Sequence, residues 1–91
     1  MIYIHGGGFT SGSNTTDILG PDYLLIADVV VVTVNYRLGA LGFMSFQDDS
    51  LKIPGNAGMK DQVMAMKFVK RNIDKFGGDP NNGKSKKFYL K

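Results

Sequence analysis

The chain has 91 residues with no cysteine and a single histidine, which excludes disulfides and leaves neither a thiolate nor a histidine-rich metal site. This length allows at most one small domain with a thin core. The formal net charge of +3 arises at the end of the sequence: residues 83–91 contain four lysines and no acid, so residues 1–82 carry a net charge of −1. Because a short lysine-rich end is usually solvated, we expect no nucleic-acid partner.

No apolar run approaches the roughly 18 residues that span a membrane, and the N-terminus has neither the charged region nor the cleavage site of a signal peptide. We therefore expect no membrane span in this chain. A cytoplasmic and a secreted parent protein are both compatible with the sequence. Met1 leads directly into an apolar run with no preceding turn, as if the chain were cut from a longer protein.

The first predicted element is a strand over residues 2–4, which ends abruptly in His5 and Gly6 to Gly8. Glycines let the backbone reach positive φ and let a ligand approach the main chain closely. Two amides held in a rigid turn at a strand end are what a developing oxyanion needs. From the glycines alone, a flexible connector is an equally good interpretation. A dinucleotide-binding fingerprint is not, because it needs glycine at position 11, where Ser11 stands.

The next elements alternate between helix and strand. Residues 9–20 are rich in small polar residues and predict a loop, and Pro21 suits the start of a short helix that runs to about Asp28. The nearly unbroken β-branched run over residues 29–34 is typical of a strand buried on both faces in a parallel sheet. The irregular connection over residues 35–55 is long for this chain, which suggests that it packs on a larger body.

The longest predicted element is a helix from the capping residue Asn56 to about Phe76, which Gly77 and Gly78 end. Apolar residues recur along it in steps of three and four, so we expect one face to enter the core, while most of the lysines face solvent. That predicted core face consists of Met59, Val63, Met66, Val69, Ile73 and Phe76.

Two charged residues far apart in the sequence are candidates for an ion pair. Arg37 follows the buried strand in a charge-poor segment, and Asp61 lies in the first turn of the long helix, where negative charge suits the helix dipole. We expect the two side chains to pair; the alternative is two separate exposed charges. The order of elements as a whole predicts an α/β protein with a parallel or mixed sheet and flanking helices.

With these elements in order, the chain resembles the type-B carboxylesterase and cholinesterase family of the α/β-hydrolase fold, and most of all the insect α-esterases. The resemblance covers residues 1–82, so it implies an incomplete sheet, a fragment of that fold. It is carried by His5-Gly6-Gly7-Gly8-Phe9, Gly12-Ser13, Gly20-Pro21-Asp22-Tyr23-Leu24, Asn35-Tyr36-Arg37-Leu38-Gly39, Gly42-Phe43, Gly55-Asn56-Ala57-Gly58, Asp61-Gln62, Asn72-Ile73 and Phe76-Gly77-Gly78-Asp79-Pro80-Asn81-Asn82.

The resemblance implies roles for the glycine turn. Gly7 and Gly8 would donate backbone N–H groups to an oxyanion hole, and His5 and Gly6 would shape the loop, with His5 not the catalytic histidine. The implied reaction of the full-length parent is hydrolysis of a small-molecule carboxylic ester by a serine nucleophile, without a metal or organic cofactor.

The resemblance also implies two structural roles. Arg37 and Asp61 fall where the family has a buried structural ion pair, in agreement with the pairing expected above. Phe68 stands at a core position where many relatives have tryptophan.

The resemblance stops after Asn82. The family continues with one more strand and a Gly-x-Ser-x-Gly nucleophile elbow, and we expect neither in the lysine-rich sequence that follows here. We therefore divide the chain into a partial α/β-hydrolase domain over residues 1–82 and a divergent lysine-rich tail over residues 83–91. No serine of the chain has glycine at both flanking positions of the elbow, and the catalytic acid and histidine are absent as well.

Residues 78–85 match the pattern of a phosphate-binding loop, Gly-x-x-x-x-Gly-Lys-Ser. Such a loop must follow a strand and open a helix, whereas this segment follows a predicted helix and contains Pro80. We expect no nucleotide site there.

The sequence thus predicts a member of an ester hydrolase family that is inactive on its own. Two alternatives stay open: an esterase-like binding or adhesion module without catalysis, and a non-functional gene fragment.

Overall fold

A parallel sheet lies at the centre of the computed structural model, which describes residues 1–13, 29–83 and 85–87. Within these ranges the strands are β1 (Ile2–Ile4), β2 (Val32–Val34) and β3 (Ser85–Lys87), in the spatial order β2-β1-β3. β1 pairs in parallel with both neighbours, with Ile4 opposite Val34 and Lys87. The predicted α/β architecture is therefore present, and its sheet is parallel rather than mixed. The helix predicted over residues 21–28 lies outside the described residues.

The strand β3 corrects the expectation that no further strand follows Asn82. Three residues of the lysine-rich tail pair with β1 on the side away from β2. The physical reason is that backbone N–H and C=O groups form the ladder whatever the side chains are, and that lysine is well tolerated on an edge strand. Composition alone therefore could not exclude this strand.

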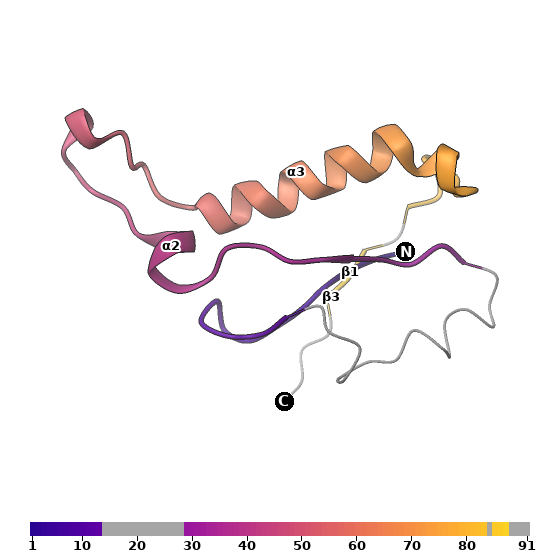
Figure 1. The fold of residues 1–91 in the computed structure, drawn as a ribbon, viewed down its shortest axis with the longest axis horizontal. Coiled ribbons are helices and arrows are strands. Elements are labelled where there is room, and N and C mark those ends of the chain that lie inside the picture. Colours follow the sequence, from indigo (N-terminus) through magenta and orange to yellow (C-terminus); the bar gives the residue numbers. More distant parts are fainter. Residues whose placement is uncertain (14–28, 84, 88–91) are drawn as a thin grey trace.

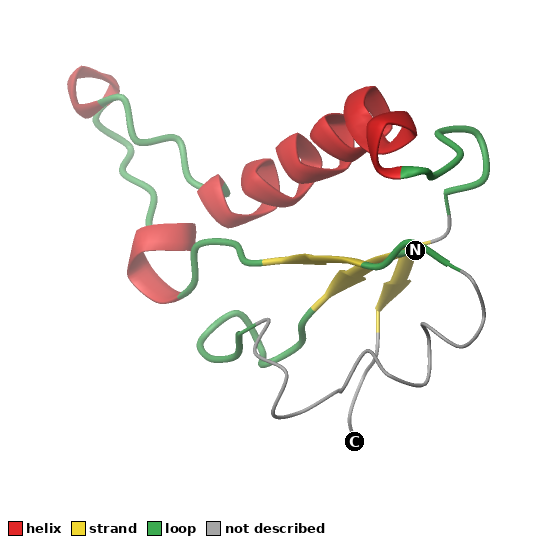
Figure 2. Ribbon diagram, turned by 45° about the vertical axis from the view of Figure 1, so that its right-hand side comes forward, coloured by secondary structure: helices red, strands yellow, loops and turns green. Residues whose placement is uncertain are grey.

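The strand β2 is shorter and less buried than the apolar run over residues 29–34 predicts. Val34 is buried, but Thr33 is exposed on the opposite face, and Val29 lies outside the strand and is exposed. Successive side chains of a strand point to opposite faces, and α3 covers one face of the sheet, as Figure 2 shows. The run is typical of burial on both faces, but one long helix can cover one face of the sheet, and Thr33 on the other face is exposed.

The connection between β2 and the long helix contains two short helices, α2 (Gly39–Phe43) and a 3₁₀ turn at Asp49–Leu51. Asp48 caps the 3₁₀ turn by accepting a hydrogen bond of 2.9 Å from the Ser50 N–H. α2 packs against the long helix, and in Figure 1 it lies at the same end of the sheet as the loop that follows β1.

The long helix α3 (Ala57–Asn72) continues as a 3₁₀ turn at Ile73–Phe76 and ends at Gly77 with φ of 78°, as predicted. Its start differs from the expectation. Asn56 adopts a left-handed conformation with φ of 56°, and its side chain makes no capping hydrogen bond. A side-chain cap needs an extended backbone at this residue, so the left-handed conformation explains its absence.

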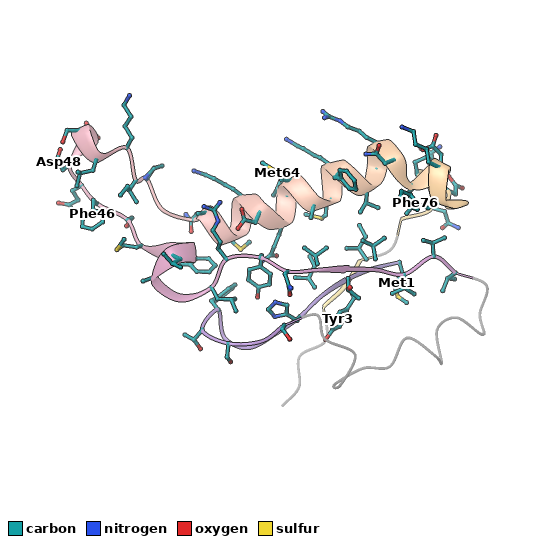
Figure 3. All side chains as sticks on the ribbon, viewed as in Figure 1. Met1, Tyr3, Phe46, Asp48, Met64 and Phe76 are labelled. Carbon is teal, nitrogen blue, oxygen red and sulfur yellow. The ribbon has the colours of Figure 1, made fainter. Side chains whose placement is uncertain are left out.

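The face of α3 that packs on the sheet is offset by about one residue from the predicted face. The prediction is confirmed for Val69 and Ile73, which are half-buried. The other buried or half-buried positions are Ala57, Gly58, Asp61, Gln62, Ala65 and Asn72. Three residues of the predicted core face, Met59, Val63 and Met66, are exposed, and Phe76 is 67% exposed. The reason lies at Gly58, which turns its open side to the Phe43 ring and the Arg37 carbonyl and so sets the rotation of the helix. Figure 3 shows Met64 on the side of α3 away from the sheet.

The core between α3 and the sheet is small. Among the described residues its buried hydrophobic members are Ile4, Val34 and Tyr36, and half-buried side chains pack around them. No helix within the described ranges has both the length and the apolar character needed to cross a membrane. The core therefore has its main contacts where β1 and β2 end, next to the glycine turn.

Candidate functional site

The glycine turn follows β1 at the carboxyl end of the parallel sheet. Gly7 has φ of 123° and Gly8 has φ of 59°, a range that favours glycine, and both residues are exposed. A Cβ atom at Gly7 would lie 2.0 Å from the Ser11 carbonyl oxygen, so no other residue fits there. A Cβ at Gly8 would meet nothing within 4 Å, so only the backbone conformation requires glycine at that position.

Hydrogen bonds fix the orientation of the peptide that joins Gly7 and Gly8. The Gly7 carbonyl oxygen accepts from the backbone N–H groups of Thr10 and Ser11, both at 3.1 Å, and from their hydroxyls at 3.2 and 3.3 Å. In a trans peptide the C=O and the next N–H point in opposite directions. The Gly8 N–H is therefore directed away from the inside of the turn.

The peptide that joins Gly6 and Gly7 is fixed in a similar way. His5 Nδ1 lies 2.9 Å from the Gly6 carbonyl oxygen. Because a carbonyl only accepts, this contact requires the tautomer with a proton on Nδ1. The Gly7 N–H then points away from the histidine. Within the described part of the chain, neither the Gly7 nor the Gly8 N–H donates a hydrogen bond, so both are available to a ligand.

The His5 side chain is a buried support rather than an exposed base. It is 3% exposed, and its ring stacks on the Tyr36 ring with 4.7 Å between centroids and an interplanar angle of 17°. A Cβ at Gly12 would lie 2.5 Å from His5 Nδ1, so Gly12 closes over the imidazole. The structure therefore places the buried His5 ring against the carbonyl of the exposed Gly6, in the peptide that carries the Gly7 N–H.

The structure brings Arg37 and Asp61 together. The Arg37 Nη2 atom donates to Asp61 Oδ1 at 2.6 Å, and Nε and the backbone N–H of Arg37 donate to Oδ2 at 2.8 and 3.0 Å. These hydrogen bonds lower the pKa of the Asp61 carboxyl from 3.8 to about 2 and raise the pKa of Arg37. The pair is not buried as the family position implies: the Arg37 side chain is 57% exposed and that of Asp61 is 23% exposed, because α3 shields the carboxylate more than the guanidinium.

One further expectation fails. Phe68, expected in the core, is 62% exposed: it lies at the edge of the contact between α3 and β2, beside Val32 and Thr33, where no further element of the described residues covers it. Residues 78–83 of the phosphate-loop pattern lie between the 3₁₀ turn at Ile73–Phe76 and β3, and several of their amides are bound internally: the Gly78 N–H donates to the Ile73 carbonyl at 2.9 Å and the Asn81 N–H to Asp79 Oδ1 at 2.8 Å. Occupied amides of this kind do not form a phosphate cradle.

Sequence reasoning missed the side chain that supports the turn from the neighbouring strand. The Tyr36 hydroxyl donates to the His5 carbonyl oxygen at 3.1 Å in a buried contact. The two residues are 31 positions apart, and a single sequence carries no signal for a contact at that separation. The parallel register of β1 and β2, which sets Ile4 opposite Val34, is what places them side by side.

Comparisons with known proteins identify the family of this chain. The carboxylesterase family model matches residues 1–82. Esterase B1 of Culex pipiens is 54% identical over 80 residues, which are 88% of this chain and 15% of that protein. Juvenile hormone esterase of Tribolium castaneum is 56% identical over 81 residues, which are 89% of this chain and 13% of that protein.

A solved structure is also similar. The juvenile hormone esterase from Manduca sexta, with OTFP covalently attached, matches with a TM-score of 0.87 at 46% identity, over 94% of this chain and 16% of that chain. The chain thus spans about a sixth or less of the length of these relatives. Its strands and helices are a part of the α/β-hydrolase fold. The chain belongs to the carboxylesterase family.

Proposed function

We propose that residues 1–82 are the oxyanion-hole segment of a serine hydrolase that cleaves small-molecule carboxylic esters. The observation that carries this proposal is the pair of N–H groups on Gly7 and Gly8. The carbonyl oxygen of each of these peptides makes hydrogen bonds that hold the peptide in place, and neither N–H donates a hydrogen bond within the described residues. Fixed donors of this kind stabilise developing negative charge without reorganising.

In the proposed reaction, a serine outside these residues attacks the ester carbonyl carbon, and the carbonyl oxygen becomes an oxyanion in the tetrahedral intermediate. The Gly7 and Gly8 N–H groups donate to that oxygen. The alcohol leaves, and water then releases the carboxylic acid from the acylated serine. Each donor contributes about 2.7–4 kcal/mol to stabilisation of the transition state, or roughly 10²–10³ in rate.

The 91-residue chain by itself is proposed to have no turnover. None of its five serines lies in a Gly-x-Ser-x-Gly sequence, and its single histidine, His5, is buried beneath the turn. Without an activated nucleophile, two oxyanion donors have no intermediate to stabilise.

The test uses a hybrid esterase, in which residues 1–82 replace the matching segment of Esterase B1 of Culex pipiens. We expect the hybrid esterase to hydrolyse p-nitrophenyl acetate and the 91-residue chain alone to remain at the buffer rate. A folded but inactive hybrid esterase would contradict the proposed role of the segment and favour a non-catalytic binding module. Burst release by the chain alone, abolished by mutation of one of its own serines, would contradict the proposed lack of turnover.

A further inference from the structure

Tyr36 makes two contacts with the histidine that precedes the glycine turn. Its hydroxyl donates to the His5 carbonyl oxygen at 3.1 Å, and its ring stacks on the imidazole with 4.7 Å between centroids. Both side chains are buried, at 8% and 3% exposure. A buried hydroxyl that bonds a backbone carbonyl fixes that peptide in place, because breaking the bond would leave both groups without water.

The same segment of chain also holds the far end of the turn. Three residues after Tyr36, the Gly39 N–H donates to the Phe9 carbonyl oxygen at 2.7 Å. The Phe9 ring meets the Phe43 ring of α2 with 4.9 Å between centroids. Gly6 to Gly8 therefore lie between two hydrogen bonds that come from the residues after β2, one at His5 and one at Phe9.

The backbone next to Tyr36 is itself fixed against α3. The Arg37 N–H donates to Asp61 Oδ2 at 3.0 Å. Cβ atoms at Gly42 and Gly58 would lie 2.2 and 2.4 Å from the Arg37 carbonyl oxygen, so the backbone of two elements closes on this peptide. The backbone next to Tyr36 is thus held in place. The Tyr36 hydroxyl therefore cannot move together with the glycine turn.

These contacts connect Tyr36 to the direction of the Gly7 N–H. The stacked imidazole keeps Nδ1 on the Gly6 carbonyl oxygen, and that bond sets the peptide that carries the Gly7 N–H. We infer that Tyr36 is a positioning residue for the oxyanion hole, which acts through His5 and never touches the substrate. This inference rests on the proposed function of Gly7 and Gly8.

The test compares variants of the hybrid esterase. Tyr36→Phe removes the hydroxyl and keeps the ring, and Tyr36→Leu removes both. We expect Tyr36→Phe to lower kcat by about tenfold and to leave KM unchanged. This loss is smaller than the roughly 10²–10³ in rate that removal of a whole oxyanion donor costs. The inhibition constant of a trifluoromethyl ketone, which forms a tetrahedral adduct with the serine, should rise by the same factor. Tyr36→Leu should show a larger change in both quantities.

Ile73→Val is the matched control, because this half-buried residue packs against the sheet far from the turn along the chain. It should lower the unfolding midpoint of the hybrid esterase without changing kcat or the inhibition constant. The inference is wrong if Tyr36→Phe changes neither quantity in an active hybrid esterase, if it raises KM alone, or if Ile73→Val has the same effect. An inactive but folded parent hybrid would instead contradict the proposed function itself.

Discussion

The carboxylate of Asp61 accepts hydrogen bonds from both the side chain and the backbone of Arg37. Because these bonds favour the charged form, the pKa of Asp61 falls from 3.8 to about 2. A carboxyl with a lowered pKa in the folded state adds stability above its unfolded pKa and loses it as the pH falls through the folded value. The pair therefore stabilises the chain above about pH 4, and the contribution disappears toward pH 2.

We expect the carbon-13 shift of the Asp61 carboxyl to titrate with a midpoint near 2 in the hybrid esterase, and higher in Arg37→Ala, which loses the side-chain donors but keeps the backbone N–H that donates to Oδ2. Ser50→Ala is the control, because Ser50 bonds Asp48 and not Asp61. It should leave the Asp61 midpoint unchanged. A midpoint near 3.8 in the unmodified hybrid esterase would show that the pair does not form in solution.

At the level of elements, α2 and α3 meet through glycine. The Arg37 carbonyl oxygen lies against both Gly42 and Gly58, and the Phe43 ring fills the remaining space beside Gly58. In an ordinary exposed helix, replacing glycine by alanine stabilises by about 1 kcal/mol. Here the added methyl group would lie 2.4 Å from the carbonyl oxygen and 2.7 Å from the ring, so it cannot be accommodated without moving an element.

Gly58→Ala should therefore destabilise the hybrid esterase by about 1–3 kcal/mol, the usual cost of overpacking, in spite of the better helix propensity. The measurement is the urea midpoint of unfolding. Met64→Ala, on the exposed side of the same helix, should change the midpoint little. A higher midpoint for Gly58→Ala would mean that α2 and α3 are farther apart than in the structure.

The elements also show what a sequence can predict. The strand at residues 2–4 and the C-terminal end of the long helix follow from local chemistry, because apolar runs, Gly77 and Gly78 act within a few residues. The rotation of α3 depends on the contact of Gly58 with Phe43 and Arg37, and the contact of Tyr36 with His5 crosses two strands. Such contacts depend on strand register and close packing, which helical periodicity does not encode.

The lysine-rich strand makes the same point. β3 forms because β1 has a second edge to pair, a property of the sheet rather than of the tail sequence. The proposed oxyanion role of Gly7 and Gly8 is implied by the resemblance. From the glycines alone, a rigid turn and a flexible connector are equally good interpretations. The structure adds the hydrogen bonds that hold the two peptides of the turn.

At the scale of the whole molecule, the chain buries little. Among its described residues no large side chain is below 2% exposure, and Leu41, Met64, Phe68 and Phe76 are mostly exposed. Among the strands of the described residues, β1 has neighbours on both sides, whereas β2 and β3 are edges of the sheet. Exposed apolar side chains and open strand edges favour association over a single packed state.

We therefore expect the 91-residue chain alone to bind an apolar dye such as anilinonaphthalene sulfonate and to unfold over a broad range with a small enthalpy. A fully packed domain of this length would show about 60 kcal/mol at its midpoint. Differential scanning calorimetry makes the comparison. A sharp transition with that enthalpy would contradict the expectation and show that the chain folds cooperatively.

The central claim, that the Gly7 and Gly8 N–H groups form an oxyanion hole, is tested most directly by two glycine substitutions in the hybrid esterase. Gly8 and Gly77 have φ of 59° and 78°, and a Cβ at either would meet nothing within 4 Å. Alanine should therefore cost a similar backbone strain at both, roughly 1–2 kcal/mol.

Gly8→Ala should lower kcat by at least about tenfold, toward the 10²–10³ of a lost donor, because the strained peptide turns its N–H away. Gly77→Ala should leave kcat unchanged, and equal kcat values for the two variants would contradict the account.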